Sequence, residues 1–312
     1  MPNRGPGMTT HATSTFISAQ DGLRLHVQEW RPRGSAAALP VFCLPGLART
    51  VADFETLACA LAADSTSAPR VIALDSRGRG RSQYDRNPAN YDLRVELADL
   101  LAVLTALEIP RAVFVGTSRG GILTMLLVGL RPTAIAGCVL NDIGPVIEPE
   151  GIARIRSYVG KLPQAATFQD GADILRRLFG AQFPRLTDTD WLAFARRTFK
   201  HEGARMVPDY DPRLAAILQG IDLEQPLPAL WKEFEGLARV PVLLLRGANS
   251  DILSVATVKE MRARHPTMQV IEVADQGHAP ILSGSALVED IVAFIRSCAA
   301  AEAKTPSESG RV

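Results

Sequence analysis

The chain has 312 residues, of which 47% are hydrophobic and 21% are charged. Its 34 Lys and Arg residues against 33 Asp and Glu residues give a net charge of +1, which argues against a protein that binds nucleic acid through a general basic field. The composition excludes a wholly disordered chain, and the length allows a large core without disulfide bonds or a structural metal. We expect about two domains, or one large α/β unit with an insertion.

The two ends of the chain, residues 1–13 and 303–312, are rich in small and polar residues, and we expect both to be flexible tails. The N-terminal segment has no apolar stretch of the signal-peptide type, and the longest apolar run, about ten residues at 121–130, is too short to cross a bilayer. The cysteines are far apart in apolar stretches, as is typical of free, buried cysteines in a reducing compartment: Cys43, Cys59, Cys138 and Cys298. These features predict a cytoplasmic protein without a membrane partner.

Short β-branched runs alternate with helical patterns over most of the chain. Residues 14–19 and 23–30 flank the turn Gln20-Asp21-Gly22 and predict an antiparallel hairpin. The helix expected after Asp92 shows leucines at 3.6-residue spacing. Continuous apolar runs, which are typical of parallel strands covered by helices on both faces, occur at 41–44, 71–74, 112–115, 138–140, 242–245 and 270–273. The alternation predicts an α/β fold with a mostly parallel, doubly wound sheet.

The alternation stops between residues 146 and 235, where prolines break several short helical patterns and no convincing strand is present. This segment contains 10 of the 18 aromatic residues in the chain. We therefore interpret 146–235 as a helical cap over the sheet, where ligand pockets form, or as an insertion with a small core of its own. The core is then expected in two parts, 14–145 and 236–302.

The motif Gly116-Thr117-Ser118-Arg119-Gly120 directly follows one predicted strand and precedes an apolar helical run. On such a sharp strand-to-helix turn, glycines remove side chains that would collide, and the serine hydroxyl is exposed above the edge of the sheet. We predict that Ser118 is a nucleophile. An ordinary glycine-rich loop is the alternative.

A serine hydroxyl needs a base to take its proton. Among the five histidines, His278 alone follows a late strand, on the loop that leads into the last predicted helix. We predict that His278 is the general base. Its partner should be a carboxylate, and Asp251, in the loop after the strand at 242–245, fits the order Ser, Asp, His of α/β hydrolases. Asp142, at the end of the preceding strand, is the rival, and we favour Asp251.

Developing negative charge on a substrate oxygen requires two backbone N–H groups. The amide of Arg119 can supply one of them, and the loop after the strand at 41–44 can supply the other. We predict that this second amide belongs to Leu47, because Gly46 allows the tight turn that would point it inward.

Taken together, these motifs resemble the α/β-hydrolase superfamily over about residues 14–300, and the layout is similar to single-cap enol-lactonases, meta-cleavage-product hydrolases and small carboxylesterases. The resemblance rests on the nucleophile turn, the LPGL loop, the DSRGRGRS segment at 75–82, the NSD loop and the QGHAP loop. It implies that Asp75, Arg77, Gly78 and Gly80 are structural. The chain departs from many relatives in having Pro45-Gly46 where they have His-Gly, and its serine nucleophile separates it from haloalkane dehalogenases and epoxide hydrolases.

These observations predict a serine hydrolase of a small, largely apolar ester or lactone, which needs water but no metal or organic cofactor. Hydrolysis of a carbon–carbon bond in a vinylogous diketone and cofactor-free perhydrolysis would use the same triad. A non-catalytic binding module is a further alternative, although such proteins typically lose a triad member.

Two questions about specificity remain open in the sequence. Arg119 or Arg49 is a candidate for binding a substrate carboxylate, but we favour an ion pair of Arg119 with Asp142 or another core carboxylate. For any single cap aromatic we favour a place in the core over a place in the pocket. Trp231 is the best pocket candidate among Trp191, Phe194, Phe199 and Trp231.

Overall fold

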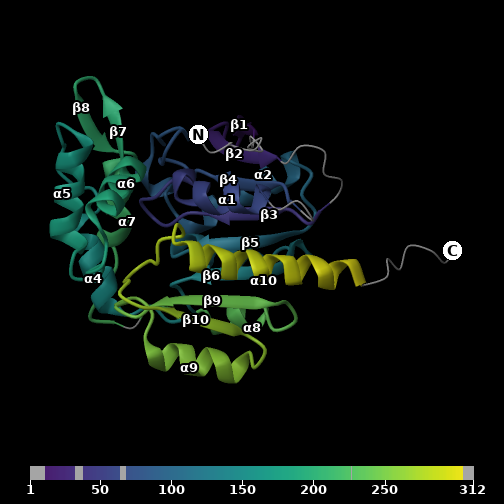
Figure 1. The fold of residues 1–312 in the computed structure, drawn as a ribbon. Coiled ribbons are helices and arrows are strands. Elements are labelled where there is room, and N and C mark those ends of the chain that lie inside the picture. The colour runs from purple at the N-terminus through teal and green to yellow at the C-terminus, as the bar shows by residue number, and fades with distance from the viewer. Residues whose placement is uncertain (1–10, 32–37, 64–67, 226, 305–312) are drawn as a thin grey trace, which may run out of the picture.

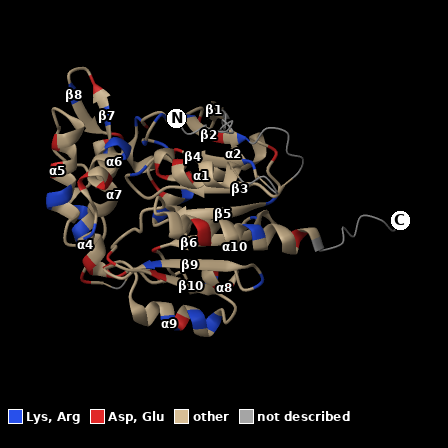
Figure 2. Ribbon diagram, in the orientation of Figure 1, with Lys and Arg blue, Asp and Glu red and all other residues tan. Residues whose placement is uncertain are grey.

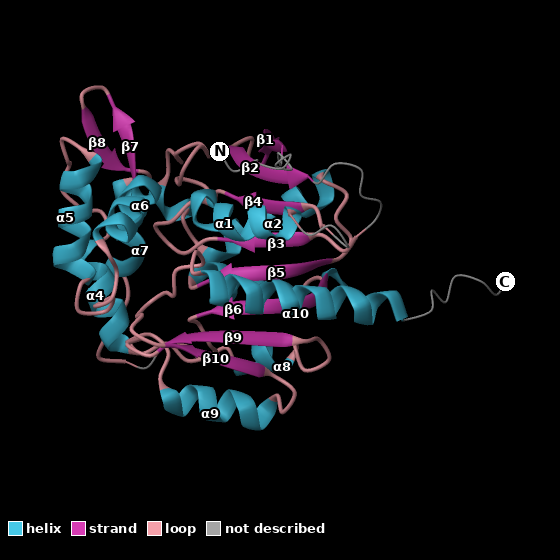
Figure 3. Ribbon diagram, in the orientation of Figure 1, coloured by secondary structure: helices cyan, strands magenta, loops and turns pink. Residues whose placement is uncertain are grey.

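A computed structural model describes residues 11–31, 38–63, 68–225 and 227–304. Its centre is an eight-stranded sheet in the order β1-β2-β4-β3-β5-β6-β9-β10, in which β2 pairs antiparallel with both β1 and β4 and the remaining pairs are parallel. Figures 1 and 3 show helices in front of and behind this sheet and a separate group of helices beyond one of its ends. The predicted doubly wound α/β sheet is confirmed.

The strands lie close to where the predicted hairpin and the six apolar runs placed them. Their bounds are β1 (His11–Ser18), β2 (Arg24–Arg31), β3 (Val41–Leu44), β4 (Val71–Leu74), β5 (Ala112–Thr117), β6 (Ile135–Asn141), β9 (Val242–Gly247) and β10 (Gln269–Val273). Successive side chains of a strand point to opposite faces, so Phe42 and Leu44 enter one core cluster and Val41 and Cys43 enter the other. Because each face is covered by helices, unbroken hydrophobicity is stable in these strands.

The helices divide between the two faces. On one face lie α1 (Glu55–Ala62) and the long α10 (Ser285–Lys304), whose apolar residues share a cluster. On the other face lie α2 (Leu93–Ala106), α3 (Arg119–Val128), α8 (Trp231–Glu235) and α9 (Val255–Arg264). The side chain of Asp92 caps α2 by accepting a hydrogen bond from the Arg94 amide, at the start predicted from the sequence.

The group of helices beyond the end of the sheet, which we call the cap, contains α4 (Pro149–Tyr158), α5 (Phe168–Phe179), α6 (Asp188–Thr198), α7 (Ala215–Gln219) and the hairpin β7 (Phe199–Glu202) and β8 (Arg205–Pro208). Capping boxes begin α5 and α6, at Thr167 with Asp170 and at Thr187 with Asp190. The cap has a third apolar cluster of its own. Charges of both signs are mixed over the cap and α9 in the view of Figure 2, in keeping with the near-zero net charge.

Four details differ from the sequence predictions. The cap contains a β-hairpin where no strand was expected. Helix α8, which we had placed in the cap, packs on the core, since Phe234 is fully buried in the cluster that includes α3. Residues 11–13 and 303–304 continue β1 and α10, while residues 1–10 and 305–312 of the expected tails lie outside the described residues. Cys59 is exposed, unlike the three other cysteines, and all four are free.

The segment at 75–82 forms a buried polar turn after β4, as its resemblance to the family implied. Both Gly78 and Gly80 have positive φ angles, of 76° and 53°, and a Cβ on Gly80 would lie 2.3 Å from Oδ2 of Asp75. The guanidinium of Arg77 donates hydrogen bonds of 2.7 and 2.6 Å to the two carboxylate oxygens of Asp99. These contacts support a structural role for Asp75, Arg77, Gly78 and Gly80.

Candidate active site

Ser118 occupies the turn between β5 and α3 with φ 51° and ψ −116°, a strained conformation for a residue with a side chain. The flanking glycines explain how the turn is accommodated. A Cβ on Gly120 would lie 2.0 Å from the carbonyl oxygen of Leu44, and a Cβ on Gly116 would lie 2.6 Å from the backbone of Gly121. The sequence motif is thus a steric requirement of the turn that presents the serine at the carboxyl end of the central strand.

The imidazole of His278 lies between the Ser118 hydroxyl and the Asp142 carboxylate. Its Nε2 is 2.8 Å from Oγ of Ser118, and its Nδ1 is 2.8 Å from Oδ2 of Asp142. A carboxylate only accepts hydrogen bonds, so the proton on the ring belongs to Nδ1, and Nε2 is left to accept from the serine hydroxyl. This is the arrangement in which a histidine can take the proton of a serine.

The carboxylate that contacts His278 is that of Asp142 and not that of Asp251, which we had favoured. Asp142 follows β6, is completely buried and has a φ of 55°. Its carboxylate also accepts hydrogen bonds from the amide of Gly247 at 2.8 Å and from Oγ of Ser250 at 2.6 Å. Three donors therefore hold this carboxylate in place. Two of them lie at the end of β9 and in the loop after it, and the third is His278.

Asp251 instead binds the cap. Its two carboxylate oxygens accept hydrogen bonds of 2.5 and 2.8 Å from the guanidinium of Arg154 on α4. Burial raises the pKa of Asp251, but the hydrogen bonds and charge of Arg154 outweigh burial and leave this pKa below its usual value. The loop after β9 turns so that Ser250, which sequence reasoning missed, points toward Asp142, while Asp251 points toward α4.

A second missed residue, Asn141, ties the histidine loop to the nucleophile turn. Its side-chain amide donates hydrogen bonds to the carbonyl oxygen of Pro280 at 3.0 Å and to Oγ1 of Thr117 at 3.1 Å. Asn141 is completely buried, and it immediately precedes Asp142, so the end of β6 supplies two groups that hold the site. An Asn-Asp pair at the end of a buried strand was the available signal.

The predicted oxyanion amides belong to the loop after β3 and to the first residue of α3, and both lie beside Ser118. A Cβ placed on Gly46 would lie 3.6 Å from Cβ of Ser118, and Leu47 lines the same cavity as the serine. The carbonyl of Leu47 accepts a 2.7 Å hydrogen bond from the buried Arg79, which fixes the orientation of the peptide group between Leu47 and Ala48. The placement is compatible with amides of Leu47 and Arg119 that face one substrate oxygen.

The side chain of Arg119 forms the core ion pair that we favoured over substrate binding. It donates to Oε2 of Glu96 at 2.6 Å and to the carbonyl oxygen of Tyr91 at 3.0 Å. Glu96 also accepts a 2.7 Å hydrogen bond from Arg79. The partner is Glu96 and not Asp142, and Arg119 does not line the cavity.

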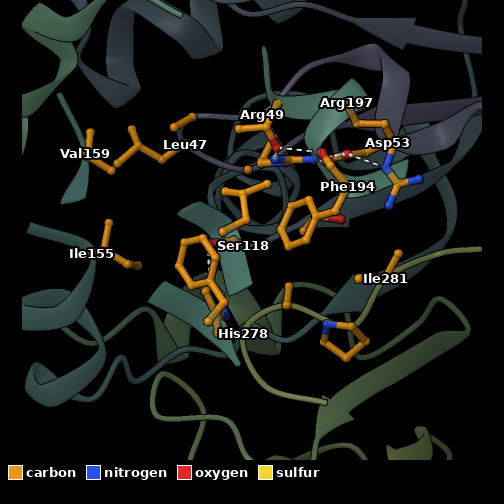
Figure 4. Close-up of a pocket in the computed structure, with 18 of the residues that line it drawn as sticks. Leu47, Arg49, Asp53, Ser118, Ile155, Val159, Phe194, Arg197, His278 and Ile281 are labelled. Carbon is orange, nitrogen blue, oxygen red and sulfur yellow. Dashed lines mark hydrogen bonds and ion pairs between the residues drawn. The ribbon is translucent and has the colours of Figure 1, made fainter. Parts of the chain in front are cut away.

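A cavity of about 120 Å³ lies between the cap and Ser118. Figure 4 shows apolar side chains from both cap and core around the serine and His278. Among the four cap aromatics named above, only Phe194 lines it; Trp191 and Phe199 are buried in the cap cluster. Trp231 is not in the cavity, because α8 lies on the core and the Arg264 guanidinium covers its ring at 4.2 Å. The apolar part of the lining is Leu47, Ala48, Ile155, Val159, Leu162, Leu175, Phe179, Phe183, Phe194, Ala279, Pro280, Ile281 and Leu282.

One wall of this cavity is charged. Arg49, Asp53, Arg197 and Thr198 line it together, and Figure 4 shows the two arginines on either side of the aspartate. Within the described parts of the chain, no group of three or more His, Cys, Asp or Glu residues is arranged to hold a metal ion. No helix among those same residues is long and apolar enough to cross a membrane.

A mostly parallel sheet with a serine on the sharp turn after its central strand is the architecture of α/β hydrolases. The sequence profile of the alpha/beta hydrolase family matches residues 41–291. The chain is similar to the 3-hydroxybutyrate-oligomer hydrolase of Cupriavidus necator, with 34% identity over 264 residues that cover 82% of this chain and 87% of that protein. It is also similar to the 2-(acetamidomethylene)succinate hydrolase of Mesorhizobium japonicum, with 25% identity over 86% of this chain and 90% of that protein.

Solved structures agree with the sequence relatives. The crystal structure of an alpha/beta hydrolase from Novosphingobium aromaticivorans superposes with a TM-score of 0.83 at 37% identity, covering 92% of this chain and 99% of that chain. The chain therefore belongs to the alpha/beta hydrolase family, as its motifs predicted.

Proposed function

We propose that this protein is a serine hydrolase of carboxylic esters, including lactones. Ser118 attacks the substrate carbonyl while His278 accepts its proton, and the Asp142 carboxylate orients the imidazole and stabilises its charged form. The amides of Leu47 and Arg119 donate hydrogen bonds to the oxyanion. His278 then donates the proton to the leaving alcohol, and water, activated by the same imidazole, releases the acyl group from Ser118.

The observation that carries this proposal is the unbroken chain of hydrogen bonds from Ser118 through His278 to Asp142, with both links at 2.8 Å. The chain ends at a cavity rather than in the packed core, since Ser118 and His278 both line it. A hydrogen-bonded serine and histidine with only a structural role would need neither the strained φ of Ser118 nor access to a cavity.

The lining of the cavity supports a small substrate with an apolar part. Aromatic and branched aliphatic side chains of the cap and the histidine loop make up most of the wall. The relative from Cupriavidus necator is named for an oligomer of 3-hydroxybutyrate, and the units of such an oligomer are joined by ester bonds. Short esters of hydroxy acids are therefore the first natural substrates to test.

The experiment is a panel of 4-nitrophenyl esters of increasing acyl length, lactones, hydroxy-acid esters and ring-cleavage dienones, with wild type and Ser118→Ala. We expect ester hydrolysis to fall by about 10³-fold or more in Ser118→Ala, and intact-mass spectra of the wild type to show a transient acyl adduct. Ser297→Ala, at an exposed position of α10 far along the chain from the residues that line the cavity, is the matched control. Ester hydrolysis that persists in Ser118→Ala would reject the proposal, and turnover of dienones alone would replace it with carbon–carbon bond hydrolysis.

A further inference from the structure

The charged wall of the cavity contains two guanidinium groups and one carboxylate. Arg49 donates to Asp53 through Nε at 2.8 Å and through Nη2 at 2.5 Å, and its Nη1 donates to Oγ1 of Thr198 at 2.6 Å. Each oxygen of the Asp53 carboxylate thus accepts a hydrogen bond from Arg49. The Asp53 carboxylate balances one positive charge on this wall, and the wall carries two.

Arg197 carries the charge that is left over. Its Nε lies 3.6 Å from Oδ1 of Asp53, which is too long for a hydrogen bond. Within the described residues, no other carboxylate lies within ion-pair distance of Arg197, and its guanidinium donates no hydrogen bond. The side chain of Arg197 is 19% exposed and lines the cavity, so the N–H groups of its guanidinium can donate hydrogen bonds to a ligand in the cavity.

The surroundings make this charge costly without a partner. Phe194 and the apolar lining lie beside the arginines, and the guanidinium of Arg49 stacks on the Phe194 ring at 4.8 Å from its centroid. Burial and the positive charge of Arg49 lower the pKa of Arg197, and the negative charges of Asp53, Asp190 and Glu55 only partly oppose them. An anion in the cavity would remove this imbalance, and attraction between opposite charges is several-fold stronger there than in water.

A purely structural role explains Arg197 less well. Arg49 already connects the core loop before α1 to α6 of the cap, through its hydrogen bond to Thr198. A second arginine placed only to hold the cap would be expected to pair with a carboxylate of its own. Arg197 instead shares the Asp53 carboxylate with Arg49, and it lines the same cavity as Ser118 and His278 (Figure 4).

We infer that this wall is a carboxylate-binding subsite, in which Arg197 binds a free carboxylate of the substrate beside Arg49 and Asp53. The substrate class is then an ester that carries a carboxylate away from the scissile bond, with an apolar segment between the two groups. The inference rests on the proposed function, which supplies the ester bond. Planar guanidinium groups suit this role because they bind a carboxylate through two parallel hydrogen bonds.

The kinetic test compares two matched series of 4-nitrophenyl esters, the hemiesters of succinate, glutarate and adipate and the same esters with the free carboxylate replaced by a carboxamide. We expect wild type to prefer the carboxylate over the amide by about 10-fold or more in kcat/KM at one chain length at least, and the preference to weaken at high salt. In Arg197→Met this ratio should fall to near one. Arg196→Met, which removes the same charge from an exposed position on the same helix, should keep the ratio of wild type.

Equal kcat/KM for carboxylates and amides in wild type, or a preference that survives in Arg197→Met, would overturn the subsite and leave the proposed ester hydrolysis intact. A binding measurement keeps the subsite testable without turnover. Calorimetry with Ser118→Ala compares monomethyl glutarate with dimethyl glutarate. We expect the anion to bind about 10-fold more tightly or better, and Ser118→Ala/Arg197→Met to lose this difference. Equal affinity for the anion and the neutral diester in Ser118→Ala would reject the subsite even if the protein hydrolysed no ester.

Discussion

Oδ2 of Asp142 lies 2.8 Å from Nδ1 of His278, although the two residues are 136 positions apart in the chain. The contact forms because β6 and β9 are neighbours in the sheet and β10 follows β9, which brings the loops after these strands to one edge. The carboxylate that completes the site therefore comes from the end of β6, and the loop after β9 contributes Ser250 as a donor to that carboxylate.

The first prediction separates the two candidate acids. Asp142→Asn should lower kcat on a 4-nitrophenyl ester by about 10³- to 10⁴-fold, because an amide cannot stabilise the charged imidazole and favours the wrong tautomer. Asp251→Asn should change kcat by less than about threefold, since its partner is Arg154 on the cap. Steady-state kinetics of the two isosteric variants check this. The reverse order of effects would restore Asp251 as the acid.

The second prediction concerns the acid limb of stability. The pKa of Asp251 is lower in the folded protein than its usual value of 3.8, so its ion pair contributes stability that is complete well above that value. The contribution is lost as the pH falls below 3.8 and through the lower folded pKa. At pH 7, Asp251→Asn should unfold with a free energy about 1–2 kcal/mol below wild type. Urea unfolding should show this gap shrinking toward pH 3, and a gap independent of pH would contradict the ion pair.

The third prediction tests the steric basis of the nucleophile turn. Gly120→Ala would place Cβ 2.0 Å from the carbonyl oxygen of Leu44, and since this neighbour is backbone of a central strand, it cannot move aside cheaply. We expect a loss of about 3 kcal/mol or more in unfolding free energy. Gly220→Ala is the control, with φ −79° and no atom within 4 Å of the added carbon, and it should stay within about 1 kcal/mol of wild type. Similar unfolding free energies for the two variants would show that the turn tolerates a Cβ at position 120, which would contradict the steric argument.

The fourth prediction concerns Arg119. Arg119→Met breaks the buried pair with Glu96, so we expect the unfolding free energy to fall by about 3 kcal/mol. Because Arg119 does not line the cavity, the ratio of kcat/KM for carboxylate and carboxamide esters should not change. Arg94→Met, at an exposed position of α2, controls for loss of a positive charge. A selective loss on carboxylate esters in Arg119→Met would assign it the role that we give to Arg197.

Local patterns in the sequence predicted most of the fold. The six continuous apolar runs all became strands of the main sheet, and the GxSxG motif was recognisable because glycines at 116 and 120 are sterically required. The β7–β8 hairpin was missed because its strands are short and only two of their eight residues are buried. Helix α8 was placed in the cap because a chain position between prolines does not reveal which apolar surface a five-residue helix packs on.

The site was less predictable than the fold. Ser118 and His278 each stood alone as a candidate of its type, whereas Asp142 and Asp251 both follow strands that end at the same edge. Choosing between them requires the direction of each side chain, which depends on the φ of 55° at Asp142 and on the turn that points Ser250 inward. Trp231 was a poor choice for the same reason, since spacing along a helix does not say which partner covers it.

The central claim, that Ser118 is activated by His278 and Asp142, is tested most directly by the rate at which a fluorophosphonate labels the protein, with the modified residue identified by peptide mass spectrometry. We expect wild type and Asp251→Asn to be labelled rapidly on Ser118, Asp142→Asn to be labelled at least about 100-fold more slowly, and Ser118→Ala to stay unlabelled. Absence of label on Ser118 in the wild type, or rapid labelling of Asp142→Asn, would contradict the account.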